Sequence, residues 1–194
     1  GSKGAKVTAS ITLASRNLVY LPNSEHIGVS SKIDDEELRN QLKGSLHDAL
    51  SKVASEQSEK QLSALSGGFI VRTAAEAFVD NQFDNDIQYL SRLWRALQRK
   101  IENRKVPCII YQELQLFERV IRDFVYPELE KIRVDSEDAF KALNEFTEEF
   151  VPEYQSKIEH YQSPRPIFDL FGVEEEISRA LGRQVNLKSG GYLV

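Results

Sequence analysis

One pair of neighbouring side chains in the sequence is suited to binding a phosphate group. Arg72 and Thr73 directly follow the apolar run Phe69–Val71, which predicts a short buried strand. A guanidinium presents a planar fork of N–H donors that matches phosphate oxygens, and the threonine hydroxyl adds a further donor. The same spacing also fits an arginine paired with a surface carboxylate and a threonine that caps the next turn. Spacing alone leaves both interpretations open.

Other residue types that carry catalysis or bind metals form no motif. His26, His47 and His160 are scattered and lack the spacing of metal ligands. Cys108 lies between a proline and two isoleucines, which predicts a buried core thiol rather than a nucleophile. The two glycine pairs lack the spacing of a P-loop or a dinucleotide-binding motif. The residues themselves therefore indicate no active site.

Charged residues are segregated along the chain, whose net charge is −5. Residues 92–105 contain six cations and one acid, whereas residues 135–153 contain seven acids and one lysine. The plain interpretation is two solvated helix faces, which such runs usually indicate. The alternative is a non-enzymatic module that uses the basic helix 92–105 to bind RNA or protein.

The composition limits the classes of protein that come into question. With 194 residues, 41% of them hydrophobic and 28% charged, the chain can bury a core of ordinary domain size. A single cysteine excludes a disulfide framework within the chain and a cysteine-rich zinc site. The sequence contains no apolar run of the roughly 18–20 residues that span a bilayer, so we expect no membrane span.

The elements that must position these residues follow from the apolar spacing. Short apolar or alternating runs predict strands at 7–13, 18–21, 69–71, 108–111, 132–134, 185–187 and 192–194. Apolar repeats of three and four predict helices at 34–53, 86–105 and 113–126, another that starts at 135–136, and a last one through 173–181. In the helix at 86–105 the predicted buried seam consists of Ile87, Leu90, Trp94, Leu97 and Ile101. The expected fold class is mixed α/β, with small sheets and packed helices.

Several segments together resemble the ribonuclease E/G family, in the same order and over nearly the whole chain. They are Lys3–Ala5, Ile11–Leu13, Leu18–Val19, Gly67–Ala74, Arg122–Phe124, Ile132–Ser136, Ser156–Tyr161, Ile167–Phe171 and Ser189–Val194. The residues in these segments resemble the ribonuclease G branch more than the ribonuclease E branch, notably at Arg72–Glu76. The stretch around 49–66 is longer than in close relatives and is expected to form an extended helix and loop.

The resemblance implies a cytoplasmic bacterial endoribonuclease that cuts single-stranded RNA in rRNA and mRNA processing and prefers a 5′ monophosphate. It implies Mg²⁺, structural Zn²⁺ and a homo-oligomer for the parent enzyme. Residues 1–15 would be the last strand of an OB-fold barrel, 16–115 the 5′-sensor region, 116–188 an RNase H-like region and 189–194 the first strand of a DNase I-like region. The catalytic aspartates would lie beyond Val194, so these residues alone would be inactive and bind no metal.

The resemblance also assigns roles to individual residues. Arg72 and Thr73 match the pair that grips the terminal phosphate, and Val19 matches an apolar residue beside the terminal nucleotide. Ser15 stands where the family has a glycine whose backbone approaches the RNA.

Two lysines match further RNA-binding positions of the family. Lys3 matches a basic residue of the RNA-binding barrel. Lys32 matches one of two consecutive arginines, while Ser31 replaces the other and weakens that contact.

Overall fold

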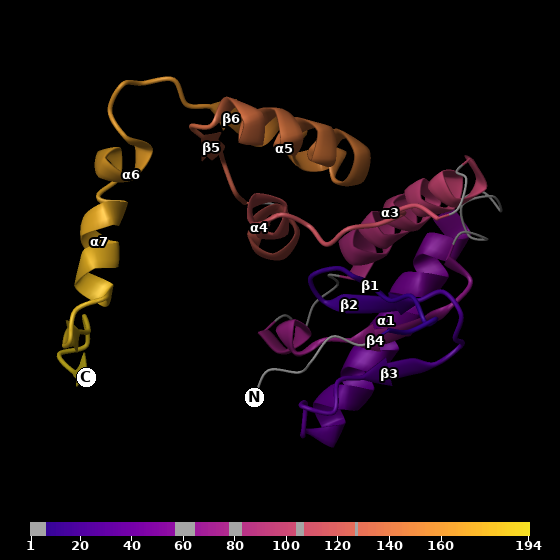
Figure 1. Ribbon diagram of the computed structural model, residues 1–194. Helices are drawn as coiled ribbons and strands as arrows, with labels where there is room; N and C mark the ends of the chain where they lie inside the picture. Colours follow the sequence, from indigo (N-terminus) through magenta and orange to yellow (C-terminus); the bar gives the residue numbers. More distant parts are fainter. Residues whose placement is uncertain (1–6, 57–64, 78–82, 104–106, 127) are drawn as a thin grey trace.

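The computed structural model describes residues 7–56, 65–77, 83–103, 107–126 and 128–194. Within these residues the chain combines helices with small sheets, which confirms the mixed α/β class (Figure 1). One part consists of a sheet with two long helices, and a second part of shorter helices and strands follows it along the chain.

A four-stranded sheet forms the N-terminal part of the described chain. Its strands are β1 (Leu13–Ala14), β2 (Leu18–Leu21), β3 (Ile27–Val29) and β4 (Gly68–Val71), in the spatial order β1-β2-β4-β3. β2 pairs antiparallel with β1 and β4, whereas β3 runs parallel to β4. A parallel pair needs a crossover connection, and α1 (Glu36–Glu56) lies within it. The strands expected at 18–21 and 69–71 are confirmed, and β3 is a strand that the sequence pattern did not reveal.

Two long helices pack against one face of this sheet, α1 and α3 (Phe83–Asn103). Leu18 and Tyr20 of β2 are buried in this layer, whereas Val19 between them is only half-buried. Successive side chains of a strand point to opposite faces, so Val19 belongs to the outer face of the sheet. The ring of Tyr20 meets Trp94 of α3 edge-on at 6.0 Å between centroids.

Both long helices follow the predicted pattern. The Asp35 carboxylate caps α1 by accepting from the backbone N–H groups of Glu37 (2.9 Å) and Leu38 (3.2 Å). In α3 the predicted seam is buried at Ile87, Leu90 and Leu97 and partly buried at Trp94. Ile101 was assigned to that seam wrongly, because its side chain is 48% exposed near the end of the helix.

The second part of the chain packs against α3 through aromatic rings. Its elements are α4 (Leu116–Phe124), β5 (Ile132–Val134), α5 (Glu137–Phe150), the 3₁₀ helix η3 (Pro152–Lys157) and β6 (Ile158–His160). The strand at 132–134 and the helix start at 135–136 are confirmed, and Ser136 caps α5 by accepting from the N–H of Ala139. Tyr89 of α3 contacts Phe146 and Phe150 of α5 at centroid distances of 6.5 and 6.2 Å.

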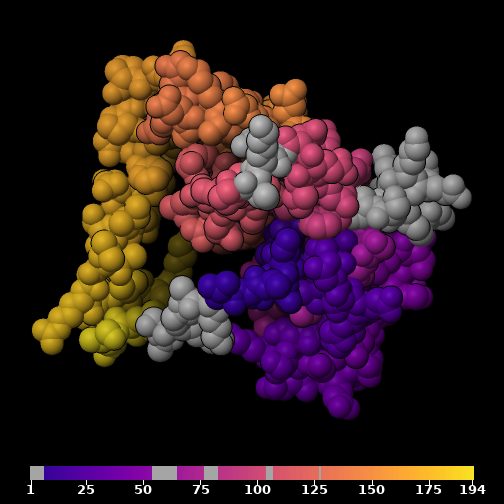
Figure 2. Space-filling model, turned by 45° about the vertical axis from the view of Figure 1, so that its right-hand side comes forward, coloured from indigo at the N-terminus to yellow at the C-terminus, as the bar shows by residue number. Residues whose placement is uncertain are grey.

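The C-terminal elements extend away from the rest of the described chain (Figures 1 and 2). They are α6 (Ile167–Leu170), α7 (Val173–Ala180) and the antiparallel pair β7 (Val185–Asn186) and β8 (Tyr192–Leu193). Neither α6 nor α7 contains a buried residue. The guanidinium of Arg133 lies 5.3 Å from the ring of Phe171 and provides one contact between this arm and β5.

Two strand predictions are wrong. Residues 7–12 are not in a strand, and Val7 and Ile11 are exposed, because β1 pairs with β2 only at Leu13 and Ala14. The apolar run 108–111 also has no strand partner among the described residues and takes an irregular conformation. Cys108 is therefore partly exposed rather than a core thiol.

The helix predicted at 113–126 is shorter than expected. α4 covers Leu116–Phe124, and Ile121 is its one buried residue. Val120 and Phe124, two other apolar residues of α4, have side chains that are 43% and 70% exposed. After α5 the chain makes the turns of η3 and is extended again only in β6.

Candidate phosphate-binding hollow

A hollow of about 460 Å³ lies on the outer face of the sheet. Its floor is a row of three paired residues across neighbouring strands, Val19, Ile70 and Gly28. Gly28 contributes no side chain, and a Cβ built there would come within 2.5 Å of His26 Nε2. The hollow therefore depends on β3, which supplies the glycine and the turn that carries His26.

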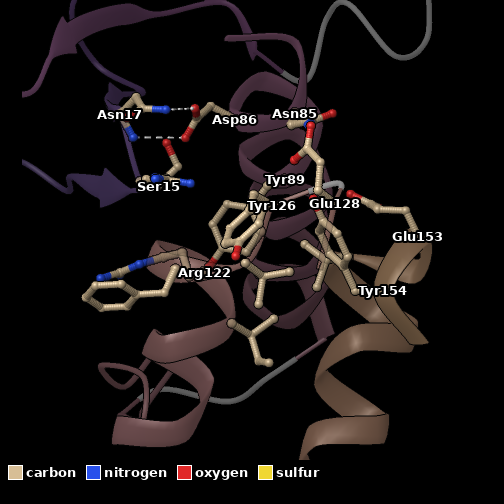
Figure 3. Close-up of a pocket in the computed structure, with 15 residues that line it drawn as sticks. Ser15, Asn17, Asn85, Asp86, Tyr89, Arg122, Tyr126, Glu128, Glu153 and Tyr154 are labelled. Atoms are coloured by element: carbon tan, nitrogen blue, oxygen red, sulfur yellow. Dashed lines mark hydrogen bonds between the residues drawn. The ribbon is translucent and has the colours of Figure 1, made fainter. Parts of the chain in front are cut away.

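A buried contact fixes the turn between β1 and β2, next to this hollow. The Asp86 carboxylate of α3 accepts from the backbone N–H of Asn17 (3.1 Å) and from its Nδ2 (2.9 Å), as Figure 3 shows. Burial raises the pKa of the Asp86 carboxyl above its usual range, although hydrogen bonds from Ser15 and Asn17 act in the opposite direction. Sequence reasoning missed this pair, since its members lie 69 positions apart.

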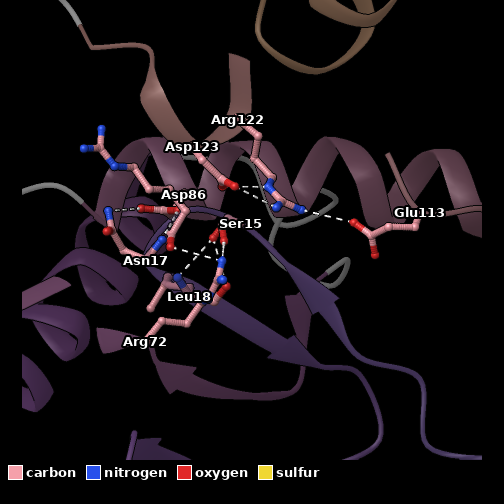
Figure 4. A network of polar contacts seen from close by, with 9 residues as sticks. Ser15, Asn17, Leu18, Arg72, Asp86, Glu113, Arg122 and Asp123 are labelled. Carbon is pink, nitrogen blue, oxygen red and sulfur yellow. Dashed lines mark hydrogen bonds and ion pairs between the residues drawn. The ribbon is translucent and has the colours of Figure 1, made fainter. Parts of the chain in front are cut away.

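Arg72 leaves β4 beside the hollow and reaches the same turn. Its backbone N–H donates to the carbonyl of Asn17 (2.8 Å), and its Nη1 donates to the carbonyls of Ser15 and Arg16 (Figure 4). A guanidinium has five N–H donors, so Nε and Nη2 can still meet an anion. Thr73 follows at the start of the 3₁₀ helix η2 (Thr73–Ala77) with an exposed side chain, and both residues line the hollow.

A loop after β3 brings Lys32 to the lining of the hollow. The loop is held from α1 by Arg39, whose Nη1 donates to the carbonyls of Ser30 (2.8 Å) and Ile33 (2.9 Å). Its Nη2 donates to the carbonyl of Val29 at 3.4 Å. Lys32 itself is exposed, so its ammonium can reach a ligand in the hollow.

The lining of the hollow is cationic or neutral throughout. Arg72, Lys32 and His26 line it together with the hydroxyls of Thr73, Ser30 and Ser31, and none of the described lining residues is acidic. This is notable in a chain with 30 acidic residues and a net charge of −5. His26 is a further candidate that sequence reasoning did not single out, because its place over Gly28 depends on a strand that the pattern did not reveal.

Not every predicted site residue reaches the hollow. Arg72, Thr73, Val19 and Lys32 line it together. Ser15 lies outside it, is 1% exposed, and donates its N–H to the carbonyl of Leu18 at 2.9 Å. The N–H that was expected to approach RNA is thus engaged within the turn. Lys3 lies outside the described residues.

The basic helix is paired with the acidic one. Arg92 Nη1 donates to the carbonyl of Phe150 (2.8 Å) and to Glu153 (3.2 Å), and Arg99 lies 4.0 Å from Glu149. The two segregated charge runs seen in the sequence therefore meet between α3 and α5. Arg104 and Lys105 of the predicted basic helix lie outside the described residues.

The cofactors that the resemblance implies have no obvious ligand set in the described part of the chain. No group of three or more His, Cys, Asp or Glu side chains there is arranged to hold Mg²⁺ or Zn²⁺. Among the same residues, no helix combines the length and the apolar character that crossing a bilayer requires.

Comparison with known sequences shows which family the chain belongs to. A sequence model described as "Ribonuclease E/G family" matches residues 12–194. The chain belongs to the ribonuclease E/G family. All 194 residues align with ribonuclease G of Escherichia coli (strain K12) at 47% identity and with ribonuclease G of Haemophilus influenzae at 42%. Ribonuclease E of Haemophilus influenzae is 31% identical over 196 aligned positions.

Membership in the ribonuclease E/G family confirms the resemblance, and these identities agree with the ribonuclease G branch. The chain spans 37% of the length of either ribonuclease G protein and 20% of the ribonuclease E protein. The residues that line the hollow all lie within the 12–194 range that matches the ribonuclease E/G family.

Proposed function

We propose that this chain is the substrate-reading part of a ribonuclease G-type endoribonuclease, and that its hollow binds the 5′ monophosphate of single-stranded RNA. The observation that carries the proposal is the lining of the hollow, where Arg72, Lys32 and Thr73 converge and none of the described lining residues is acidic. An anion gains most from such a site, because no carboxylate opposes it.

Each residue has a defined part in binding. A 5′ monophosphate carries a charge near −2, like a phosphorylated side chain, and has three oxygens that accept hydrogen bonds. Arg72 would bind two oxygens through its planar fork, and Thr73 would donate from its hydroxyl. Lys32 would supply a point charge from the loop after β3. Val19 on the floor would contact the sugar or base of the terminal nucleotide, which we infer from its half-buried apolar side chain.

The site is prepared for its ligand before binding. The contacts of Arg72 Nη1 with the carbonyls of Ser15 and Arg16 restrict the guanidinium to one side of the hollow. Restricting a long side chain in advance reduces the entropy lost on binding. A 5′ hydroxyl would lack the charge that these donors attract.

The finer roles of the parent protein remain proposals that rest on family membership. Residues 16–115 would form the 5′-sensor region, 116–188 an RNase H-like region, and 1–15 and 189–194 the edges of a barrel and of a DNase I-like catalytic region. Cleavage would depend on Mg²⁺ bound by aspartates outside these residues, with Zn²⁺ as a structural ion. The parent would be a cytoplasmic homo-oligomer in which Lys3 and Ser15 lie near the RNA.

Binding of matched oligonucleotides tests the proposal. The two RNAs have the same single-stranded sequence and a 3′ fluorophore, and one carries a 5′ phosphate while the other carries a 5′ hydroxyl. Fluorescence anisotropy should give tighter binding of the phosphorylated RNA. Thr73→Val and Lys32→Gln should each reduce that preference, because each removes a donor of the hollow.

The control variant is Lys43→Gln, which removes an exposed lysine from α1 away from the hollow. It should lower the affinity for both RNAs little and equally. Equal affinity of the unmodified chain for the two RNAs would contradict the proposal, as would an unchanged preference in both hollow variants.

A further inference from the structure

A histidine side chain covers part of the floor of the phosphate hollow. His26 stands two positions before Gly28, so both belong to the same face of the sheet. The imidazole Nε2 lies 2.5 Å from the point where a Cβ of Gly28 would stand. Gly28 is buried beneath this ring, whereas His26 itself is exposed and lines the hollow. A ligand in the hollow can therefore touch the imidazole, which the proposed binding of the 5′ phosphate does not use.

Two hydrogen bonds fix the backbone of this histidine. The His26 N–H donates to the hydroxyl of Ser24 (3.1 Å), and its carbonyl accepts from the N–H of Phe69 in β4 (2.8 Å). The first bond shapes the turn before β3, and the second ties that turn to β4. The imidazole thus extends over the floor from an anchored backbone, so only the rotation of its own side chain must be fixed when it meets a ligand.

Arg72 and His26 stand at different edges of the floor. The strand order is β1-β2-β4-β3, and neighbouring strands lie about 4.8 Å apart, which separates β2 from β3 by about 10 Å. Arg72 Nη1 donates to the carbonyls of Ser15 and Arg16 in the turn that leads into β2, whereas His26 covers Gly28 in β3. Two groups that attract anions at such a separation suit two successive phosphate groups of one RNA strand, with the sugar and base between them over the floor.

The side chains around His26 favour an anion. Arg72 and Lys32 are the other titratable residues that line the hollow within the described chain, and β2 contributes the apolar Val19. Glu25 precedes His26 in the same turn and is exposed, but it is not among the residues that line the hollow. An imidazole gains a proton between about pH 5 and pH 8, and a bound anion stabilises the protonated form. His26 can therefore supply a positive charge when a phosphate is present.

We propose that His26 binds the first internucleotide phosphate of the RNA in its protonated form, so that binding takes up a proton. The 5′ phosphate meets Arg72 and Thr73, as in the proposed function on which this arrangement rests, and the sugar and base of the terminal nucleotide lie over Val19. The phosphodiester that follows meets the imidazolium, which donates a hydrogen bond to one of its oxygens.

The contact between His26 and a phosphodiester does not itself require a 5′ phosphate, because each internal linkage of RNA carries a negative charge. The two contacts can therefore be tested separately.

The pH dependence of RNA binding tests the uptake of a proton. Fluorescence anisotropy gives the affinity of the 194-residue chain for 5′-phosphorylated RNA at about pH 6.5 and about pH 8, both above the second pKa of the phosphate. We expect the affinity to be about three- to tenfold higher at the lower pH, because a charged hydrogen bond forms there. Circular dichroism at both pH values shows whether the chain stays folded.

Two modified RNAs show which phosphate His26 meets. Both carry a 5′ phosphate and one methylphosphonate, a linkage that has lost its negative charge. In one RNA it replaces the first internucleotide linkage, and in the other it replaces a linkage near the 3′ end. The RNA with the neutral first linkage should lose the rise in affinity at the lower pH, whereas the control RNA should keep it.

Variants of His26 separate its charge from its hydrogen bond. His26→Gln keeps a donor but cannot become charged, so its affinity should not rise at the lower pH. His26→Lys is charged at both pH values and should bind equally well at both. His47→Gln is the matched control, because His47 is exposed on α1 and does not line the hollow. This control should keep the rise of the unmodified chain.

Three results would overturn the proposal: the affinity does not rise at the lower pH, His26→Gln shows the same rise as the unmodified chain, or the RNA with the neutral first linkage keeps the rise. The modified RNAs keep the test valid if a variant fails to fold. If the rise is absent while the preference for a 5′ phosphate persists, only this inference falls. If the rise depends on His26 and on the first linkage but 5′-phosphorylated and 5′-hydroxyl RNA bind equally, only the proposed function falls.

Discussion

Two glycines have different roles: Gly28 leaves space in the floor of the phosphate hollow, and Gly68 allows close packing of the backbone in the sheet. A Cβ at position 28 would meet the ring end of the exposed His26 side chain, which can move aside. A Cβ at position 68 would meet backbone atoms, including the carbonyl oxygen of His26 at 2.3 Å. The two positions therefore separate an effect on binding from an effect on folding.

Alanine at each position should show this difference. Gly68→Ala should lower the free energy of unfolding by about 1–3 kcal/mol, because the backbone of a packed sheet must shift. Gly28→Ala should lower it by less than about 1 kcal/mol yet weaken binding of 5′-phosphorylated RNA, since the new methyl group and the displaced His26 fill the floor. Urea denaturation and fluorescence anisotropy measure the two effects. Equal destabilisation by both variants would contradict this explanation.

Asp86 is the buried residue on which the β1–β2 turn depends. Asp86→Ala should lower the free energy of unfolding by about 2–4 kcal/mol, because it leaves two donors of Asn17 unpaired. Burial raises the pKa of this carboxyl above its ordinary 3.8, so the folded chain holds its proton more tightly than the unfolded chain does. Its contribution to stability is thus most favourable below that ordinary value and is lost as the pH rises through the raised pKa.

The pH dependence follows from this sign. Measured against Asp86→Asn, which does not titrate, the unmodified chain should lose stability as the pH rises from about 4 toward neutrality. Urea denaturation at several pH values gives the difference. If the free energy of unfolding of the unmodified chain, relative to that of Asp86→Asn, rises with pH or stays constant, the hydrogen bonds from Asn17 outweigh the effect of burial on the pKa of Asp86.

Some candidate residues can be recognised from the residues next to them in the sequence, and others only from contacts between distant positions. Arg72 and Thr73 could be singled out as candidates, because a strand and its exit are visible in a few adjacent residues, although the spacing left a second interpretation of the pair open. Asn17 and Asp86 could not, since their contact joins positions 69 apart and neither belongs to a motif.

At the scale of elements, α1 both covers the sheet and holds the loop with Lys32. Arg39→Ala would remove the hydrogen bonds to the carbonyls of Val29, Ser30 and Ile33. We expect a loss of about 1–2 kcal/mol in the free energy of unfolding and a weaker preference for the 5′ phosphate, because the loop would no longer be held. Lys43→Gln on the same helix should change neither quantity. A normal preference in Arg39→Ala would mean that the loop does not position Lys32.

The basic side chains of α3 serve mainly to dock α5. Arg92→Ala should lower the free energy of unfolding by about 1–2 kcal/mol, because Arg92 bonds both a backbone carbonyl and Glu153. Arg99→Ala should cost less than about 0.5 kcal/mol, since its contact with Glu149 is long and exposed. Thermal denaturation compares them. RNA affinity that collapses in the charge-reversal variant Arg95→Glu/Arg99→Glu regardless of the 5′ end would instead favour a basic-helix binding module.

Helices were easier to predict than strands for a physical reason. α1 and α3 are each 21 residues long, so their apolar repeats extend over several turns. The strands are two to four residues long, too short to show an alternating pattern. The apolar runs at 7–13 and 108–111 look like strands locally, but only pairing makes a strand. β3 was missed because only parallel pairing with β4 completes it.

For the molecule as a whole, the distribution of charge matters more than its sum. A chain of net charge −5 has a hollow whose described lining contains no acid, and its basic helix is engaged by its acidic one. The phosphate hollow therefore gathers Arg72 and Lys32 at a place where none of the described lining residues is acidic. Such an arrangement favours a terminal phosphate at this place and repels the RNA backbone from acidic surfaces.

The most direct test is a thermodynamic cycle between Arg72 and the 5′ phosphate. Affinities are measured for 5′-phosphorylated and 5′-hydroxyl RNA with the unmodified chain and with Arg72→Lys, which keeps the charge but loses the planar fork. We predict that the unmodified chain prefers the phosphate by roughly ten- to hundredfold, as expected for a charged hydrogen-bonded pair, and that Arg72→Lys loses most of this preference. The same preference in both chains would contradict a phosphate site at Arg72.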